Sequence, residues 1–66
     1  MEITLIIGED KEIKEISEDR NIKNLLEMLD VPSETVVVKK NDFIVIDEEI
    51  IEDGDTIEII KVIYGG

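Results

Sequence analysis

The sequence lacks cysteine and histidine, two side chains that often carry nucleophilic or acid–base chemistry near neutral pH. It has no cysteine, which excludes disulfides, thiolate metal sites and persulfide chemistry on the chain itself. It has no histidine, the commonest metal ligand and the side chain best suited to acid–base catalysis near pH 7. We therefore expect a protein that is not an enzyme, has no catalytic residues and binds no metal or cofactor.

Basic residues are also scarce. The chain has seven Lys and Arg and 18 Asp and Glu, which gives a net charge of -11. This charge repels phosphate backbones and anionic membranes. We expect neither nucleic acid nor membrane as a direct partner. Two interpretations of the acidic surface remain open: it matches an electropositive protein partner, or it only keeps the chain soluble.

Long apolar runs are missing too. No stretch approaches the roughly 20 residues of a membrane span, and Met1 is followed by Glu2 rather than by a signal segment. These features predict a cytoplasmic protein. The absence of alanine and tryptophan, with much Glu, Lys and Ile, predicts a thermophilic source, because charged surfaces cost less at high temperature.

Aliphatic residues are what the chain has in abundance. Its 66 residues include 14 Ile, 6 Val and 4 Leu, enough to fill one layer between a sheet and a helix. So short a chain buries only about 60% of its unfolded surface, so the core is small. We expect one domain over residues 1–64, without repeats or linkers.

The N-terminal residues predict a hairpin. Residues 2–7 place three aliphatic side chains on one face of an extended chain, which is typical of a strand. Turn-forming residues 8–11 follow, and residues 12–17 are predicted to pair back. Ile13 and Ile16 are three residues apart, a spacing that also fits a helix, so a bulge would be needed to keep both inward.

A short helix is predicted next. Asn21 is a typical N-cap, and Pro32 cannot continue a helical hydrogen-bond ladder. Between them lies one apolar stripe, made by Ile22, Leu25, Leu26 and Leu29. These signals predict a helix over residues 22–29.

The second half of the chain predicts three more strands. Residues 35–39 and 43–46 are β-branched or aromatic and flank a short loop at 40–42. Residues 56–63 are apolar on both faces and predict a central strand. The element order fits an α+β domain in which one helix packs across a mixed sheet of four to five strands.

An acidic segment separates the last two strands. Residues 47–55 hold six carboxylates and Gly54, which invites a calcium interpretation. With Gly54 as the sixth residue of an EF-hand loop, positions three and twelve are Ile51 and Ile60, so the pattern fails. Neighbouring carboxylates here lack the desolvation that separates catalytic pKa values, which favours a solvated loop.

The most informative feature is the pair Gly65 and Gly66 after the last strand. Glycine has no Cβ, so a flexible tail of residues 65–66 can lie extended in a narrow channel and bring its carboxylate to another protein's reactive group. The alternative is a frayed end or cloning remnant. With glycine near 7% of residues, a chance pair occurs at about 0.5%. The residues alone therefore predict that Gly65 and Gly66 present the terminal carboxylate to a partner protein, which supplies the chemistry.

A second candidate site is an apolar face for partner binding. Strand alternation places Ile60, Val62 and Tyr64 near or on the face away from the helix, and Ile6 joins them there. If exposed, these residues form a docking surface; the alternative is an irregular last strand that buries some of them.

Four segments carry a family resemblance. They are Asn21-Ile22-Lys23-Asn24-Leu25-Leu26, Val31-Pro32-Ser33-Glu34-Thr35-Val36, Glu52-Asp53-Gly54-Asp55-Thr56-Ile57-Glu58-Ile59-Ile60 and Gly65-Gly66. Their order and spacing resemble the ubiquitin-like sulfur carriers of the ThiS and MoaD group, including the small archaeal modifier proteins. Length and motifs are closest to ThiS, since MoaD proteins are usually longer. One departure is Lys40-Asn41-Asp42, where the family commonly has Asn-Gly, so the hairpin geometry is expected to differ.

The resemblance implies a β-grasp fold and a carrier role. An E1-like enzyme would use ATP to adenylate Gly66, and a sulfur donor would convert it to a thiocarboxylate. An acceptor enzyme would then use the sulfur for tRNA thiolation, thiamin or molybdopterin synthesis. The archaeal relatives imply an alternative, in which a target lysine attacks activated Gly66 and forms an isopeptide bond. A noncovalent ubiquitin-like binding module is the third possibility.

Overall fold

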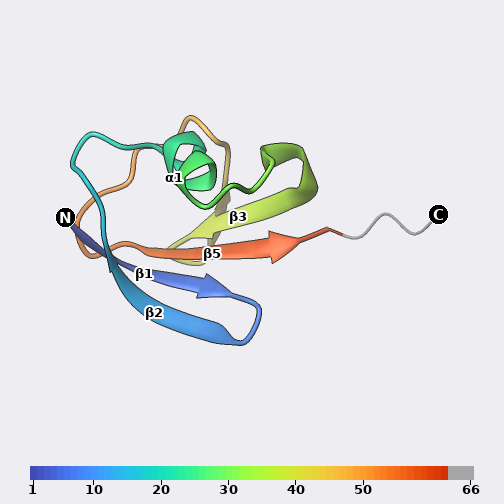
Figure 1. The fold of residues 1–66 in the computed structure, drawn as a ribbon, viewed down its shortest axis with the longest axis horizontal. Coiled ribbons are helices and arrows are strands. Elements are labelled where there is room, and N and C mark those ends of the chain that lie inside the picture. The colour runs from blue at the N-terminus through green and yellow to red at the C-terminus, as the bar shows by residue number, and fades with distance from the viewer. Residues whose placement is uncertain (63–66) are drawn as a thin grey trace.

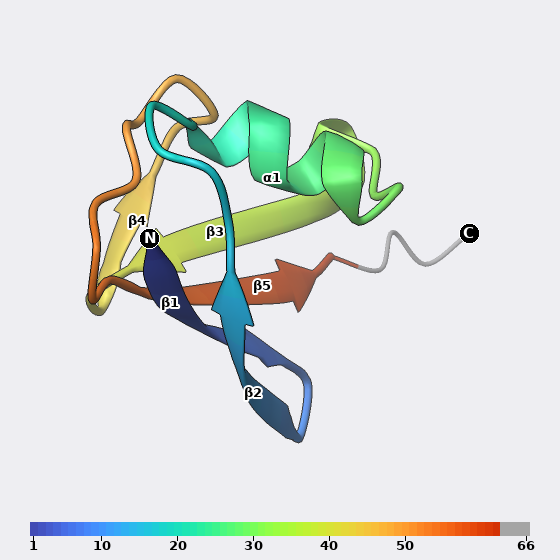
Figure 2. The same ribbon diagram turned by 60° about the vertical axis from the view of Figure 1, so that its left-hand side comes forward.

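One helix lies across one face of a five-stranded sheet. A computed structural model describes residues 1–62. In chain order the elements are β1 (Glu2–Ile7), β2 (Asp10–Glu15), α1 (Ile22–Met28), the 3-10 turn η1 (Ser33–Thr35), β3 (Val36–Lys40), β4 (Phe43–Val45) and β5 (Thr56–Lys61). Figures 1 and 2 show α1 above the sheet from two directions. The predicted α+β class is confirmed.

The sheet is mixed, and β5 is its central strand. The strand order is β2-β1-β5-β3-β4. β5 runs parallel to β1 and antiparallel to β3, while β1–β2 and β3–β4 are hairpins. The central position predicted for the last strand is confirmed. β5 ends at Lys61, and residue 63 of the predicted strand lies outside the described residues.

The core lies between the sheet and α1. It contains the inward residues of β1, β3 and β5, the apolar stripe of the helix and two residues from connecting segments. The buried set is Ile3, Leu5, Ile16, Ile22, Leu25, Leu26, Val38, Ile51, Ile57 and Ile59. Fully burying each such side chain contributes roughly 1.5–3 kcal/mol. The other sheet face is therefore left for solvent or a partner.

The bulge expected in the second strand is absent. β1 and β2 pair without interruption from Glu2 with Glu15 to Ile7 with Asp10, so no extra residue enters the ladder. Ile13 lies on the outer face with a 62% exposed side chain, whereas Ile16 is buried. No bulge is needed, because only Ile13 belongs to the strand. β2 ends at Glu15, and Ile16, the next residue, enters the core.

Helix α1 is held by side-chain and backbone caps. Asn21 accepts a hydrogen bond from the Asn24 backbone (2.8 Å), and the Asn24 side chain accepts one from the Asn21 backbone (3.0 Å). This capping box confirms the predicted N-cap. The helix ends at Met28, one residue before the prediction, because Leu29 is already the C-cap.

The β3–β4 loop is a two-residue turn. Asn41 and Asp42 both have positive φ, 51° and 73°, as a type I′ turn requires. The expectation that the lack of Asn-Gly changes this hairpin is therefore wrong: Asp42 adopts the left-handed angle that glycine would take. The Asn41 side chain also donates to Asp55 (2.9 Å) and accepts from the Thr56 backbone (2.9 Å).

The acidic segment is tied to the sheet by Lys40. Its ammonium lies 2.8 Å from Glu49 and 3.8 Å from Asp55, and donates to the Ile50 carbonyl (3.0 Å). The hydrogen bond to Glu49 raises the pKa of Lys40 above its usual value. The nearby carboxylates also raise it, whereas desolvation lowers it.

Within residues 1–62 no group of carboxylates is arranged to hold a metal ion. No helix in that range has the length and apolar character needed to cross a membrane.

Candidate functional site

Strand β5 divides its side chains between the two sheet faces. Ile57 and Ile59 are buried under α1. The alternate residues Thr56, Glu58 and Ile60 therefore lie on the outer face. The Ile60 side chain is 36% exposed, which is enough for contact with another molecule.

Two neighbouring strands add apolar side chains beside Ile60. Val37 on β3 pairs directly with Ile60. Ile6 on β1 pairs with Glu58, which precedes Ile60 by two residues and lies on the same face. Val37 and Ile6 are both half-buried. Ile6, Val37 and Ile60 are here called the outer-face patch. It is a small apolar surface built from the three central strands.

Charged side chains of both signs border the outer-face patch. Lys39 stands opposite Glu58 across β3 and β5, and Lys11 stands opposite Ile6 across β2 and β1. Lys39 and Glu58 carry opposite charges on facing strands and therefore attract each other. The three side chains of the patch are aliphatic and offer apolar surface to a partner.

The structure brings together part of the predicted site. Ile6 and Ile60 share the outer face, as alternation predicts, and β5 is regular through Lys61. Val62 is half-buried beyond the strand end, where its N–H donates to the Thr35 carbonyl (3.0 Å) and it lines a hollow with Val31. Tyr64, Gly65 and Gly66 lie outside the described residues. Their roles, and the docking role of Ile6, Val62 and Ile60, stay predictions.

Val37 and Ile44 were missed by the sequence reasoning. Residues 36–38 are all valine, so alternation gives no sign of which one faces outward. Ile44 lies on the outer face because it pairs with Lys39. The length of the turn at residues 41–42 could have predicted this position. A two-residue loop places Lys40 opposite Phe43, and this register places Lys39 opposite Ile44.

Comparison with known families decides the family. The sequence model of the ThiS family matches residues 4–66, almost the whole chain and including both terminal glycines.

The chain belongs to the ThiS family.

Solved structures agree with this assignment. A thiamine biosynthesis protein, ThiS from Geobacter metallireducens, is 26% identical, with 96% of this chain and 99% of that chain covered at a TM-score of 0.67. SAMP1 from Haloferax volcanii is 13% identical, with both chains fully covered at a TM-score of 0.75. The ubiquitin of Caldiarchaeum subterraneum is 19% identical over 100% and 98% of the two chains, at a TM-score of 0.69. Curated protein sequences gave no match.

These findings confirm the ubiquitin-like β-grasp fold and the resemblance to ThiS and the small archaeal modifiers. ThiS-family membership supports a small carrier or modifier that works with an E1-like enzyme and sulfur-transfer partners. For this ThiS-family chain, chemistry at Gly66 and a particular pathway are matters of proposal.

Proposed function

We propose that this protein is a sulfur carrier whose Gly66 carboxylate is adenylated by an E1-like enzyme and converted to a thiocarboxylate. The observation that supports this most strongly is the ThiS-family match, which runs from residue 4 through Gly65 and Gly66. The proposal assigns no acid–base work to residues 1–62, which contain neither histidine nor cysteine. The protein itself would not be an enzyme.

The chemistry takes place on the terminal carbonyl. A carboxylate oxygen of Gly66 attacks the α-phosphorus of ATP, and pyrophosphate leaves. A persulfide sulfur of the donor then attacks the acyl carbon, and AMP leaves. Reduction of the resulting acyl disulfide by a thiol frees the thiocarboxylate. The activating enzyme consumes the ATP, so this chain needs no bound cofactor. An acceptor enzyme then takes the sulfur for tRNA thiolation, thiamin or molybdopterin synthesis.

The deciding experiment examines Gly66 directly. Untagged protein purified from its own cells without reductant is measured by intact mass spectrometry. Replacement of one oxygen by sulfur at Gly66 supports the carrier role. A genomic deletion of the Gly66 codon is the matched test. If every sulfur-transfer activity of the host survives that deletion, the proposal fails.

The outer-face patch is proposed as the docking surface for the activating enzyme, and Val62 and Tyr64 are proposed to bind the same enzyme. Ile60→Asp places a charge on the patch without entering the core, so we expect about a tenfold or greater loss in adenylation efficiency. Ile13→Asp is the control, because Ile13 is also exposed on the outer face but lies on the edge strand β2. Equal losses in both variants argue against the patch.

Covalent protein modification is a second candidate, favoured by the likeness to an archaeal ubiquitin. It predicts isopeptide bonds between Gly66 and target lysines. Chymotrypsin cuts after Tyr64 and leaves Gly-Gly on the lysine, whereas trypsin cuts after Lys61 and leaves residues 62–66. Finding both remnants on one site identifies this chain as the donor. Their absence in wild-type cells argues against modification.

A noncovalent binding module is separated from both by one variant. Extra residues after Gly66 block adenylation but leave a surface such as the outer-face patch intact. A module of that kind tolerates the extension and loses function with Ile60→Asp. The opposite pattern excludes it.

A further inference from the structure

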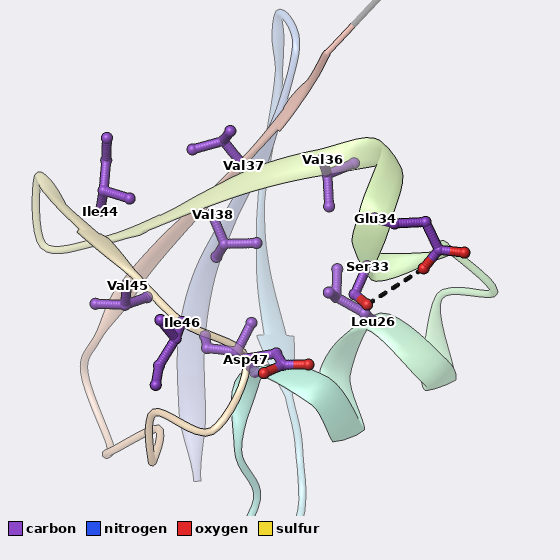
Figure 3. A pocket seen from close by; sticks show the side chains of 11 residues that line it. Leu26, Ser33, Glu34, Val36, Val37, Val38, Ile44, Val45, Ile46 and Asp47 are labelled. Atoms are coloured by element: carbon purple, nitrogen blue, oxygen red, sulfur yellow. Dashed lines mark hydrogen bonds between the residues drawn. The ribbon is translucent and has the colours of Figure 1, made fainter.

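Strand β3 is only partly covered on the side away from β5. β3 pairs with β5 along all five residues, but with β4 only from Val38 to Lys40. β4 ends at Val45, and no strand of the described chain lies beside Val36 on that side. A groove opens there between β3, β4, η1 and α1, and Figure 3 shows it from close by.

The backbone of β3 directs a hydrogen-bond acceptor into this groove. Val62 donates to the Thr35 carbonyl and Asn41 donates to the Thr56 carbonyl, so residues 35 and 41 face β5. Alternation then turns the even-numbered residues of β3 the other way. Val38 and Lys40 pair there with β4. The Val36 N–H donates to the Ser33 carbonyl within η1. By the same alternation, the Val36 carbonyl is directed away from β5, toward the groove.

The lining of the groove is apolar. Buried Leu26 and Val38 form its base, and half-buried Val36 and Val45 form its sides. At the rim, the Ile46 side chain is 68% exposed. An extended peptide can place one side chain against this base while its backbone pairs with β3, which is how strands add to an open sheet edge.

Acidic residues stand at both ends of the groove. Figure 3 shows Glu34 beside Ser33 at the η1 end, and Asp47 between Ile46 and Leu26 in the segment that follows β4. The 11 lining residues include no Lys or Arg. Among the residues that the structure describes, the Glu34 side chain accepts a hydrogen bond only from the Ser33 hydroxyl, at 3.5 Å. With a net charge of -11, this surface attracts basic segments and opposes a second copy of the chain.

We propose that the groove binds an extended apolar segment of a partner protein flanked by Lys or Arg. One backbone N–H of the segment donates to the Val36 carbonyl, one side chain packs on Leu26 and Val38, and the flanking cations meet Glu34 and Asp47. The groove meets the outer-face patch only at Val37. It is therefore a second binding site, and it depends neither on Gly66 nor on the proposed carrier function.

The probe is a capped synthetic peptide with alternating valine and isoleucine between two lysine pairs. It is titrated into the ¹⁵N-labelled full chain, and amide shifts are mapped. We expect saturable shifts at residues 34–38 and 44–47. Ile46→Asp and Asp47→Lys should each weaken binding about tenfold, the effect of losing one contact of roughly 1.4 kcal/mol. Ile13→Asp and Glu12→Lys are the matched controls on β2 and should leave binding unchanged.

Several results would overturn the proposal. They are the absence of saturable shifts, shifts confined to the outer-face patch, and equal weakening by the β2 controls. Equal binding of a peptide with glutamate in place of lysine removes the charge argument. Equal binding of a peptide N-methylated at its central residue removes the strand pairing. Concentration-dependent dimerisation with shifts in the groove assigns it to a second copy instead.

Discussion

Within residues 1–62, four residues other than glycine have positive φ, and all four are Asp or Asn. They are Asp19, Asp30, Asn41 and Asp42, with φ between 51° and 73°. Their short polar side chains tolerate the left-handed region better than other residues do. At Asp30 this angle closes α1: the Asp30 N–H donates to Glu27 and the Val31 N–H donates to Leu26, a Schellman motif. The chain thus makes tight turns with few glycines.

Replacing Asp42 with glycine should stabilise the fold. Its φ of 73° strains a side chain with a Cβ, and glycine relieves that strain at some entropic cost. We expect a gain of about 0.5–1 kcal/mol in the free energy of unfolding, measured by urea denaturation. Glu48→Gly removes the same charge at an exposed turn without positive φ and should give no gain. A loss at Asp42 would contradict the strain argument.

Asp55 should contribute far more to the stability of the fold than Asp53 does. The Asp55 side chain is 90% or more buried, and it accepts from the Glu52 backbone (2.7 Å) and from Asn41 (2.9 Å). Asp55→Ala leaves these donors without an acceptor, so we expect a loss of about 2–3 kcal/mol in chemical denaturation.

The control for this prediction is Asp53→Ala. Asp53 accepts from the Glu2 backbone at 2.7 Å, but the bond is exposed and water can replace it, so we expect a loss below about 1 kcal/mol. Both variants remove one negative charge. Similar losses would show that removal of the charge, rather than burial of the hydrogen bonds, causes the destabilisation.

Among the elements, the seven-residue helix α1 should depend strongly on its capping box. So short a helix is unstable alone, and the paired Asn21 and Asn24 side chains satisfy two backbone donors at its start. We expect Asn21→Ala to cost about 1 kcal/mol. In a double-mutant cycle with Asn24→Ala, the two losses should be less than additive. Strict additivity would mean that the two bonds act independently.

Elements with strong local signals could be predicted from the sequence. The N-cap at Asn21, the break at Pro32 and the apolar residues 56–63 gave α1 and β5 within a few residues. The second strand was harder to predict. Which of its isoleucines faces the core depends on where β2 ends, and the residue pattern of the strand does not show that. Ile13 and Ile16 look alike in the sequence, yet one is exposed and one is buried.

Residues of the binding surfaces could be predicted only where alternation within a single strand shows which face they occupy. Ile6 and Ile60 follow from alternation within their own strands. Val37 requires the register between β3 and β5, a long-range pairing that three consecutive valines do not encode. The groove beside Val36 follows from β4 being shorter than β3, which is a property of the folded chain.

At the scale of the whole molecule, net charge should oppose folding. A charge of -11 on 66 residues makes the compact state repel itself, and added salt screens that repulsion. We expect the melting temperature to rise between low salt and about 1 M NaCl, where the screening length falls to about 3 Å. Glu12→Lys combined with Glu48→Lys should make the rise smaller. A fall with salt would mean that surface ion pairs dominate instead.

The central position of β5 has a consequence for biosynthesis. Of the five strands β5 is made last, yet it alone joins the β1–β2 hairpin to the β3–β4 hairpin. A nascent chain that has not released β5 from the ribosome holds two unconnected hairpins and an uncovered helix. The sheet therefore closes through contacts between distant parts of the chain, which slows folding. A chain whose synthesis stopped before β5 would therefore contain both hairpins without the strand that joins them into one sheet.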